Sequence, residues 1–202
     1  MRLRIRPALI VVLLLVLLSV ALRGIWMPQV GLFLNVPDEV GKADVILIWP
    51  GEHFARMNKA IELYDQGWAP KIVVFSMSDD DFFGTVARLL QSDMTEQQAL
   101  MRYFERGGIP AGAVDVRAIS DRSDIGDVIE RDHPKSVILV LDSYYMRRVS
   151  RALATRLHNP PVRVYHVSTT PAYYEPAHWW RNRTELKIVF GEYLRLGASS
   201  LR

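Results

Sequence analysis

The chain contains no cysteine among its 202 residues. Disulfide frameworks, thiolate zinc sites, iron–sulfur clusters and cysteine nucleophiles are therefore excluded. No GxGxxG motif follows the first predicted strand, and the sequence has neither a Walker A motif nor a GxSxG elbow, which disfavours a dinucleotide dehydrogenase, a P-loop NTPase and an α/β hydrolase. The five histidines form no HxH or HxxxH pair, which disfavours a metal site built from one local motif.

Acidic residues are missing from residues 1–27, which hold four arginines. The rest of the chain holds 21 basic and 22 acidic side chains, so the basic excess comes from the N-terminus. A nearly neutral remainder lacks the basic surface that a phosphate backbone requires, and we expect no nucleic-acid partner. Half of the residues are hydrophobic and 23 % are charged, which indicates a packed globular domain.

A long hydrophobic run does occur, over residues 7–22, where the hydroxyl of Ser19 is the single polar side-chain group. As a helix this run would be about 24 Å long, whereas a bilayer core is about 30 Å thick. Residues 25–27 extend the run, and Arg23 can snorkel to the headgroups. The sequence therefore predicts a transmembrane signal-anchor over residues 1–27, in contact with the lipid bilayer through residues 7–27.

The charges beside this run predict its orientation. Three arginines precede it and one follows, so the positive-inside rule places the N-terminus in the cytoplasm and the rest of the chain outside. For a bacterial protein this means a single-pass inner-membrane protein with a periplasmic domain. A secretory signal cleaved near the small residues 19–21 is an alternative. A buried core helix is disfavoured by the uniform hydrophobicity and the flanking arginines.

The remaining chain divides into a linker and one domain. Residues 28–42 are rich in proline and glycine without clear periodicity, which is typical of a linker. Residues 43–202 then alternate between apolar runs typical of buried parallel strands and amphipathic segments typical of helices. The expected strands cover residues 43–49, 71–76, 114–119, 136–141 and 162–167. The expected helices cover residues 54–68, 82–90, 93–106, 124–131, 144–157 and 185–196, and Asp93 with Glu96 fits a capping box.

Five strands separated by helices predict an α/β fold, because parallel strands need crossover connections of about this length. We expect a doubly wound, mainly parallel, Rossmann-like sheet with flanking helices. Ligands of such sheets bind beyond the carboxyl ends of the strands. That rule selects the loops at residues 49–53, 76–79, 120–124 and 142–145. Arg147 and Arg148 follow the last loop at a helix start, where an anion can bind.

The order of these features resembles the YdcF/SanA/ElyC-like family of bacterial envelope proteins, over roughly residues 43–196. The motifs that carry the resemblance are the strand ending in a turn at Gly51, the segment Gly67-Trp68-Ala69-Pro70-Lys71, the helix start Thr95-Glu96-Gln97-Gln98, the turn Gly108-Ile109-Pro110 and the segment Asp142-Ser143-Tyr144-Tyr145-Met146-Arg147-Arg148. The resemblance implies a Rossmann-like domain behind a single N-terminal anchor, and a role in peptidoglycan, exopolysaccharide or barrier maintenance. Some relatives are thought to bind S-adenosylmethionine, which makes this the one cofactor that the resemblance suggests.

The candidate ligand-binding residues combine the loop rule with this resemblance. They are Gly51, His53, Arg56, Ser76, Glu96, Ser123, Asp124, Asp142, Tyr145 and Arg148. One hypothesis is a protein that binds a phosphorylated envelope precursor, such as a lipid-linked sugar, with Arg56 and Arg148 holding the anion. No catalytic residue is assigned, and no metal ligand is predicted.

Departures from the family pattern support a second hypothesis. Trp49 and Pro50 replace glycines, Tyr145 stands where the family has a histidine, and the family's Asn-Thr-x-Glu-Asn loop reads Arg-Ser-Asp-Ile-Gly at residues 122–126. A tyrosine of ordinary pKa, about 10, is no base near neutral pH. The chain would then be a non-catalytic, membrane-tethered partner or assembly factor that acts with another envelope membrane protein.

Overall fold

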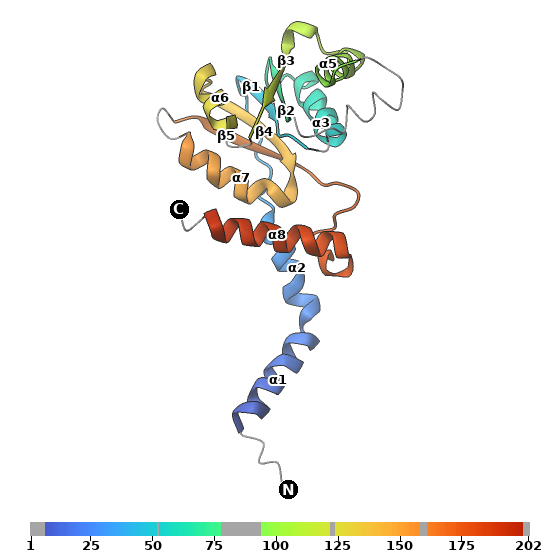
Figure 1. Ribbon diagram of the computed structural model, residues 1–202, viewed down its shortest axis with the longest axis vertical. Helices are drawn as coiled ribbons and strands as arrows, with labels where there is room; N and C mark the ends of the chain where they lie inside the picture. The colour runs from blue at the N-terminus through green and yellow to red at the C-terminus, as the bar shows by residue number, and fades with distance from the viewer. Residues whose placement is uncertain (1–6, 52, 78–93, 122–123, 158–160, 200–202) are drawn as a thin grey trace.

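A computed structural model describes residues 7–51, 53–77, 94–121, 124–157 and 161–199 of the chain (Figure 1). Five parallel strands form one sheet in the order β3-β2-β1-β4-β5. The strands are β1 Val45–Ile48, β2 Ile72–Met77, β3 Val114–Ile119, β4 Ser136–Asp142 and β5 Arg163–Thr169. This arrangement confirms the predicted α/β class, and the sheet is wholly parallel where a mainly parallel one was expected.

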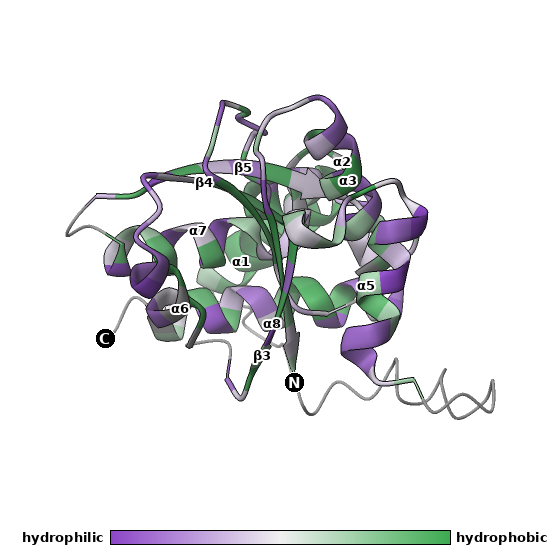
Figure 2. Cartoon of the chain, turned by 90° about the horizontal axis from the view of Figure 1, so that it is seen from above, coloured by the Kyte–Doolittle hydropathy of each residue, from purple (hydrophilic) through white to green (hydrophobic). Residues whose placement is uncertain are grey.

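The three inner strands, β1, β2 and β4, are buried on both faces, because each face of the sheet packs against its own helices. Alternate residues such as Ile46 and Ile48 face α3 (His53–Asp65) and α5 (Glu96–Arg106). Their neighbours Val45 and Leu47 face α6 (Asp124–Asp132) and α7 (Ser143–Arg156). Figure 2 shows the hydrophobic strands between these two sets of helices. A strand covered on both faces needs apolar residues at every position, which explains the continuous apolar runs.

A third layer packs against α7 on the side away from the sheet. It consists of α2 (Arg23–Leu34), the short 3₁₀ helix η2 (Trp179–Arg181) and α8 (Arg183–Ser199). Leu34, Trp179 and Val189 from these three elements share one buried cluster with Tyr144 of α7. The N-terminal part of the chain is therefore packed into the domain from α2 onward.

The helix before this layer makes little contact with it. α1 (Pro7–Ala21) extends away from the domain (Figure 1), and its valine, leucine and isoleucine side chains are 48–62 % exposed. Within the described residues no single helix is both long and apolar enough to cross a bilayer. Residues 8–21 and 23–34 pass that test together, as a pair bent by 70°.

All five predicted strands agree with the structure within two residues at each end, but two local expectations differ from it. The predicted capping box of α5, Asp93 with Glu96, is placed two residues too early. In the structure α5 begins at Glu96, so Thr95 is the N-cap and Gln98 is its partner. The expected linker is helical in its first half, since α2 continues through Pro28 to Leu34. The helix expected at residues 82–90 lies outside the described residues. A short 3₁₀ helix, η1 (Ala111–Ala113), precedes β3.

Candidate functional site

The order of strands in the sheet reverses between β1 and β4, a place called the topological switch point. A buried ion pair lies there, beside the carboxyl ends of the two strands. Arg56 of α3 and Asp142 at the end of β4 have side chains that are 1 % and 2 % exposed. The Arg56 Nε donates to Asp142 Oδ1 at 3.0 Å, and Nη2 donates to Oδ2 at 2.5 Å. The two side chains therefore form a bidentate pair, the strongest geometry for a guanidinium with a carboxylate.

The loop after β1 holds the other side of the guanidinium. Arg56 Nη1 donates to the carbonyl oxygens of Trp49 at 2.7 Å and Pro50 at 2.8 Å. Gly51 adopts a φ of +129°, and a Cβ at this position would lie only 3.0 Å from Arg56 Nη1. The positive φ requires glycine at this position, and the missing Cβ also leaves room for the guanidinium of Arg56.

Asp142 receives two further hydrogen bonds. Thr169 Oγ1 donates to Oδ1 at 2.8 Å, and the Tyr144 hydroxyl donates to Oδ2 at 3.0 Å. Thr169 is the register partner of Asp142 at the end of β5. Four protein donors thus surround the carboxylate in a buried position, which is what a buried charge requires.

The charges of this cluster reinforce one another. Burial opposes the charge of Arg56, but its hydrogen bonds to Asp142 and the negative charge of that residue outweigh burial and raise the pKa of the guanidinium. Burial, followed by the charge of Asp142, raises the pKa of Tyr144 far above the usual range. Tyr144 is therefore a hydrogen-bond donor and no acid or base near neutral pH.

The second predicted arginine is also paired. Arg148 of α7 donates from Nε to Glu192 Oε2 at 2.7 Å, and Glu192 is fully buried between α7 and α8. The guanidinium also lies 5.6 Å from the ring centre of Tyr145. Tyr145 packs edge to face against Tyr144, with ring centres 4.3 Å apart. Arg148 and Tyr145 therefore join α8 to the sheet domain.

A smaller polar pair lies at the end of β2. The Ser76 hydroxyl donates to Glu96 Oε2 at 2.6 Å, and Ser76 is 7 % exposed. Glu96 is the first residue of α5, next to the Thr95 N-cap, so the helix start positions its carboxylate beside the strand end. This carboxylate can accept hydrogen bonds from hydroxyl groups, and its negative charge opposes binding of a phosphate.

The predicted residues thus fall into three groups. Gly51, Arg56 and Asp142 form the switch-point cluster, Ser76 and Glu96 form the pair at β2, and Tyr145 and Arg148 face α8. α3 begins at His53 and α6 at Asp124, but their side chains and all of Ser123 lie outside what the structure describes. Sequence reasoning missed Thr169, which the register of β5 against β4 would have revealed.

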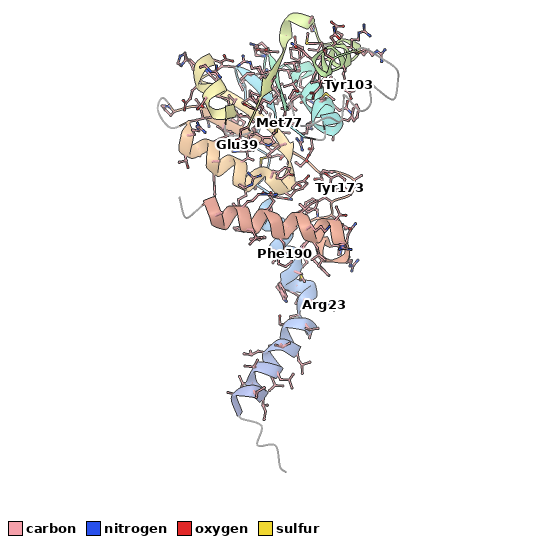
Figure 3. All side chains as sticks on the ribbon, viewed as in Figure 1. Arg23, Glu39, Met77, Tyr103, Tyr173 and Phe190 are labelled. Carbon is pink, nitrogen blue, oxygen red and sulfur yellow. The ribbon has the colours of Figure 1, made fainter. Side chains whose placement is uncertain are left out.

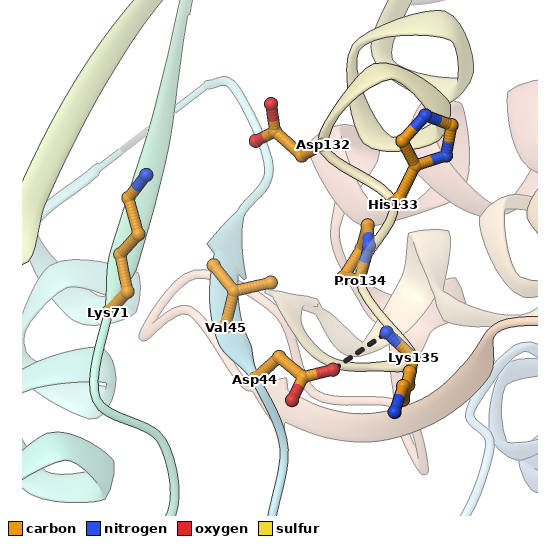
Figure 4. A pocket seen from close by; sticks show the side chains of 7 residues that line it. All are labelled: Asp44, Val45, Lys71, Asp132, His133, Pro134 and Lys135. Carbon is orange, nitrogen blue, oxygen red and sulfur yellow. Dashed lines mark hydrogen bonds between the residues drawn. The ribbon is translucent and has the colours of Figure 1, made fainter.

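A hollow lies at the other end of the strands, beside the amino ends of β1, β2 and β4 (Figure 4). It measures about 550 Å³ and is lined by Asp44, Val45, Lys71, Asp132, His133, Pro134 and Lys135. Its carboxylates already have protein partners: Asp44 accepts from the Lys135 and Ser136 amides, and Asp132 pairs with Arg117. None of the predicted ligand residues lines it, and ligands of such sheets bind at the carboxyl edge.

The comparisons with known proteins add no assignment. No profile of a known protein family matches the chain, and no curated protein matches it either. Among the described residues, no group of three or more histidine, aspartate and glutamate side chains could hold a metal ion.

Proposed function

We propose that this protein is a membrane-anchored protein of the bacterial cell envelope, with a role in cell-wall or exopolysaccharide biogenesis or in barrier maintenance. The observation that carries the proposal is α1, which extends away from the domain and whose apolar side chains are about half exposed or more. So large an exposed apolar surface is costly in water and favourable in lipid. The envelope role itself rests on the resemblance of residues 43–196 to the YdcF/SanA/ElyC-like family.

The arginines of residues 1–6 place the N-terminus in the cytoplasm and the domain in the periplasm. A cysteine-free chain allows a direct test. Single variants Leu3→Cys and Gln97→Cys, which keep all three arginines, would be exposed to a membrane-impermeant maleimide on spheroplasts. We expect labelling at position 97 and, until lysis, none at position 3. The reverse pattern, or release of the protein from membranes by alkaline carbonate, would overturn the proposal.

Within this role, we propose that the domain is a non-catalytic tethered partner or assembly factor. Arg56 and Arg148, which the sequence offered as anion ligands, donate to Asp142 and Glu192. An anion could take the Arg56 guanidinium only by displacing a carboxylate that is almost fully buried, and that would leave a buried charge without its partner. Arg148 is bonded through its Nε to Glu192, which ties this guanidinium to α8. Stoichiometric co-purification of another membrane protein in mild detergent is the expected result.

A second candidate function is binding of a phosphorylated envelope precursor through its sugar, for which the Ser76–Glu96 pair offers hydrogen-bonding groups. This pair lies at a carboxyl strand end and suits the hydroxyl groups of a sugar. A thermal-shift screen of the full chain in detergent would use a sugar pyrophosphate, a polyprenyl phosphate and S-adenosylmethionine. A ligand at 100 times its Kd adds about 2.7 kcal/mol, or several degrees for a chain of this size.

The variant Glu96→Gln separates the two functions. Loss of a ligand-induced shift in this variant would establish the precursor-binding site at β2. An absence of any shift in the unmodified protein, together with a co-purified partner, would establish the assembly role.

A further inference from the structure

One face of α8 points away from the domain and carries an unusual set of side chains. Arg183, Lys187, Phe190, Leu194 and Ala198 follow one another at spacings of three or four residues, so they lie on one side of the helix. All five are exposed, Phe190 by 60 % and Leu194 by 74 %. We call these five residues the outer strip of α8.

The acidic residues of α8 lie on the opposite side. Glu185 is 7 % exposed and Glu192 is fully buried, on the same face as Val189 and Leu196. Glu185 accepts a hydrogen bond from the Glu175 amide, and Glu192 accepts from Arg148 and Arg195. A helix at an ordinary water-exposed surface places its charges of both signs outward. α8 instead presents cations at the start of its outer strip and apolar side chains after them.

The outer strip lies on the side of the molecule from which α1 extends. α8 runs across the direction of α1 in Figure 1, and Figure 3 places Phe190 on the α8 face toward α1. Hydrogen bonds fix this arrangement, because Tyr193 of α8 donates to the Val30 carbonyl of α2 and Trp179 of η2 donates to the Met27 carbonyl. α2 also exposes Ile25 by 69 % and Trp26 by 42 %. The apolar surface therefore continues from α1 along α2 toward the outer strip.

We propose that α8 is an in-plane membrane helix, whose outer strip rests on the bilayer that α1 enters. Phe190 and Leu194 insert at the boundary between headgroups and acyl chains, and Arg183 and Lys187 bind anionic lipid headgroups. This combination of apolar side chains and flanking cations is typical of interfacial helices. The inference rests on the proposed membrane anchoring and adds a second attachment, which fixes the orientation of the domain on the membrane.

A spin label at single cysteines tests this contact in the full chain. The protein would be reconstituted into vesicles of three parts zwitterionic and one part anionic lipid. Leu194→Cys reports on the outer strip, Leu14→Cys on α1, and Gln97→Cys on an exposed position of α5. Collision with oxygen, which concentrates in lipid, is compared with collision with a water-soluble nickel complex.

We expect the label at position 14 in the hydrocarbon, the label at position 194 at interfacial depth and the label at position 97 in water. If position 194 is as accessible to nickel as position 97 while position 14 stays in lipid, the α8 contact is wrong and the anchor stands. If position 14 is also in water, the anchoring proposal fails and the inference fails with it. If neither reagent reaches position 194, a protein covers the strip and the lipid contact is overturned, and dipolar broadening between labels would identify a second copy of the chain.

The headgroup contact has its own control. Lys187→Glu should move the label at position 194 toward water on anionic vesicles and have a much smaller effect on purely zwitterionic ones. Arg102→Glu makes the same charge change at an exposed position of α5 and should leave the depth unchanged. Equal effects of the two substitutions would refute a specific role for Lys187.

Discussion

The charges of Arg56 and Asp142 balance each other at a site that is nearly inaccessible to water. Removing one member leaves the other buried without its counter-ion, which typically costs about 3–5 kcal/mol. We expect Asp142→Leu to lower the melting midpoint of the detergent-solubilised chain by about 6–20 °C, at about 2–4 °C per kcal/mol. The double variant Arg56→Met/Asp142→Leu should lose much less than the sum of the two single variants. Additive losses would show that the two charges are not coupled.

His166 of β5 gives the domain a pH dependence of its own. Burial lowers the pKa of its imidazole, against the opposing charges of Glu39 and Asp38. The folded state therefore binds the proton less readily than the unfolded state, so stability is full at high pH and falls as pH drops through the unfolded pKa of about 6.5. The slope cannot exceed about 1.4 kcal/mol per pH unit for one proton.

The measurement is the melting midpoint between pH 8 and pH 5.5, for the unmodified chain and for His166→Gln. As pH falls, the midpoint of the unmodified chain should fall relative to that of the variant, because only the unmodified chain loses stability through this residue. Two curves that stay parallel over this range would show that His166 does not carry the dependence.

Single residues were predictable where a local rule applies to them. Asp142 and Ser76 were found because each ends an apolar strand, and both indeed lie at the carboxyl edge. The pairing of Arg56 with Asp142 was not predictable, because these residues are 86 positions apart and meet only once β1 lies beside β4. A local pattern shows that a charge is present, whereas its partner depends on strand order.

The packing of α2 against η2 depends on a close backbone approach at Gly31. A Cβ at Gly31 would lie 2.1 Å from the Pro176 carbonyl oxygen and 2.6 Å from a ring carbon of Trp179. Gly31→Ala should therefore separate α2 from η2 and lower stability by about 1–3 kcal/mol, the usual cost of overpacking. The melting midpoint in detergent and the rate of proteolysis between α2 and the domain would both report this change.

Gly24→Ala is the matched control, because no atom lies within 4 Å of a Cβ at that position of the same helix. Gly24 is the second residue of α2, and alanine has a higher helix propensity than glycine. The control should therefore keep or slightly raise the midpoint. Equal destabilisation by both substitutions would contradict a specific contact at Gly31.

The helix α2 also shows why elements near the N-terminus were harder to predict than the strands. Pro28 and Gly31 are typical of loops, and together they suggested a linker. Both are accommodated in the structure, Pro28 within the helix and Gly31 at its contact with η2. The inner strands β1, β2 and β4 were predictable because burial on both faces requires a continuous apolar run, which turns and helices interrupt clearly.

At the scale of the whole molecule, the α/β class followed from the alternation of strands and helices, but the third layer did not. That layer joins residues far apart in the chain, as in the hydrogen bond from Trp179 to the Met27 carbonyl. Its presence means that α1 is joined to the domain through α2, which packs against η2, α7 and α8.

The molecule as proposed has two attachments to the membrane, and they differ in chemistry. The first is α1, which the double variant Leu13→Asp/Leu17→Asp would disable, since each charge at the centre of a spanning helix costs about 2.5–3.5 kcal/mol. Both leucines are more than half exposed, so the melting midpoint of the domain should change by no more than about 2 °C. Leu13→Ile/Leu17→Ile is the control that keeps the helix apolar.

Flotation with vesicles, after removal of detergent, separates the two attachments. The unmodified chain and the isoleucine control should float with zwitterionic and anionic vesicles alike and resist 0.5 M salt. The aspartate variant should float only with anionic vesicles and be released by salt, because the remaining attachment through Arg183 and Lys187 is electrostatic and screened. Salt-resistant flotation of this variant with zwitterionic vesicles would mean that α1 is not the anchor, since a charged α1 cannot provide it.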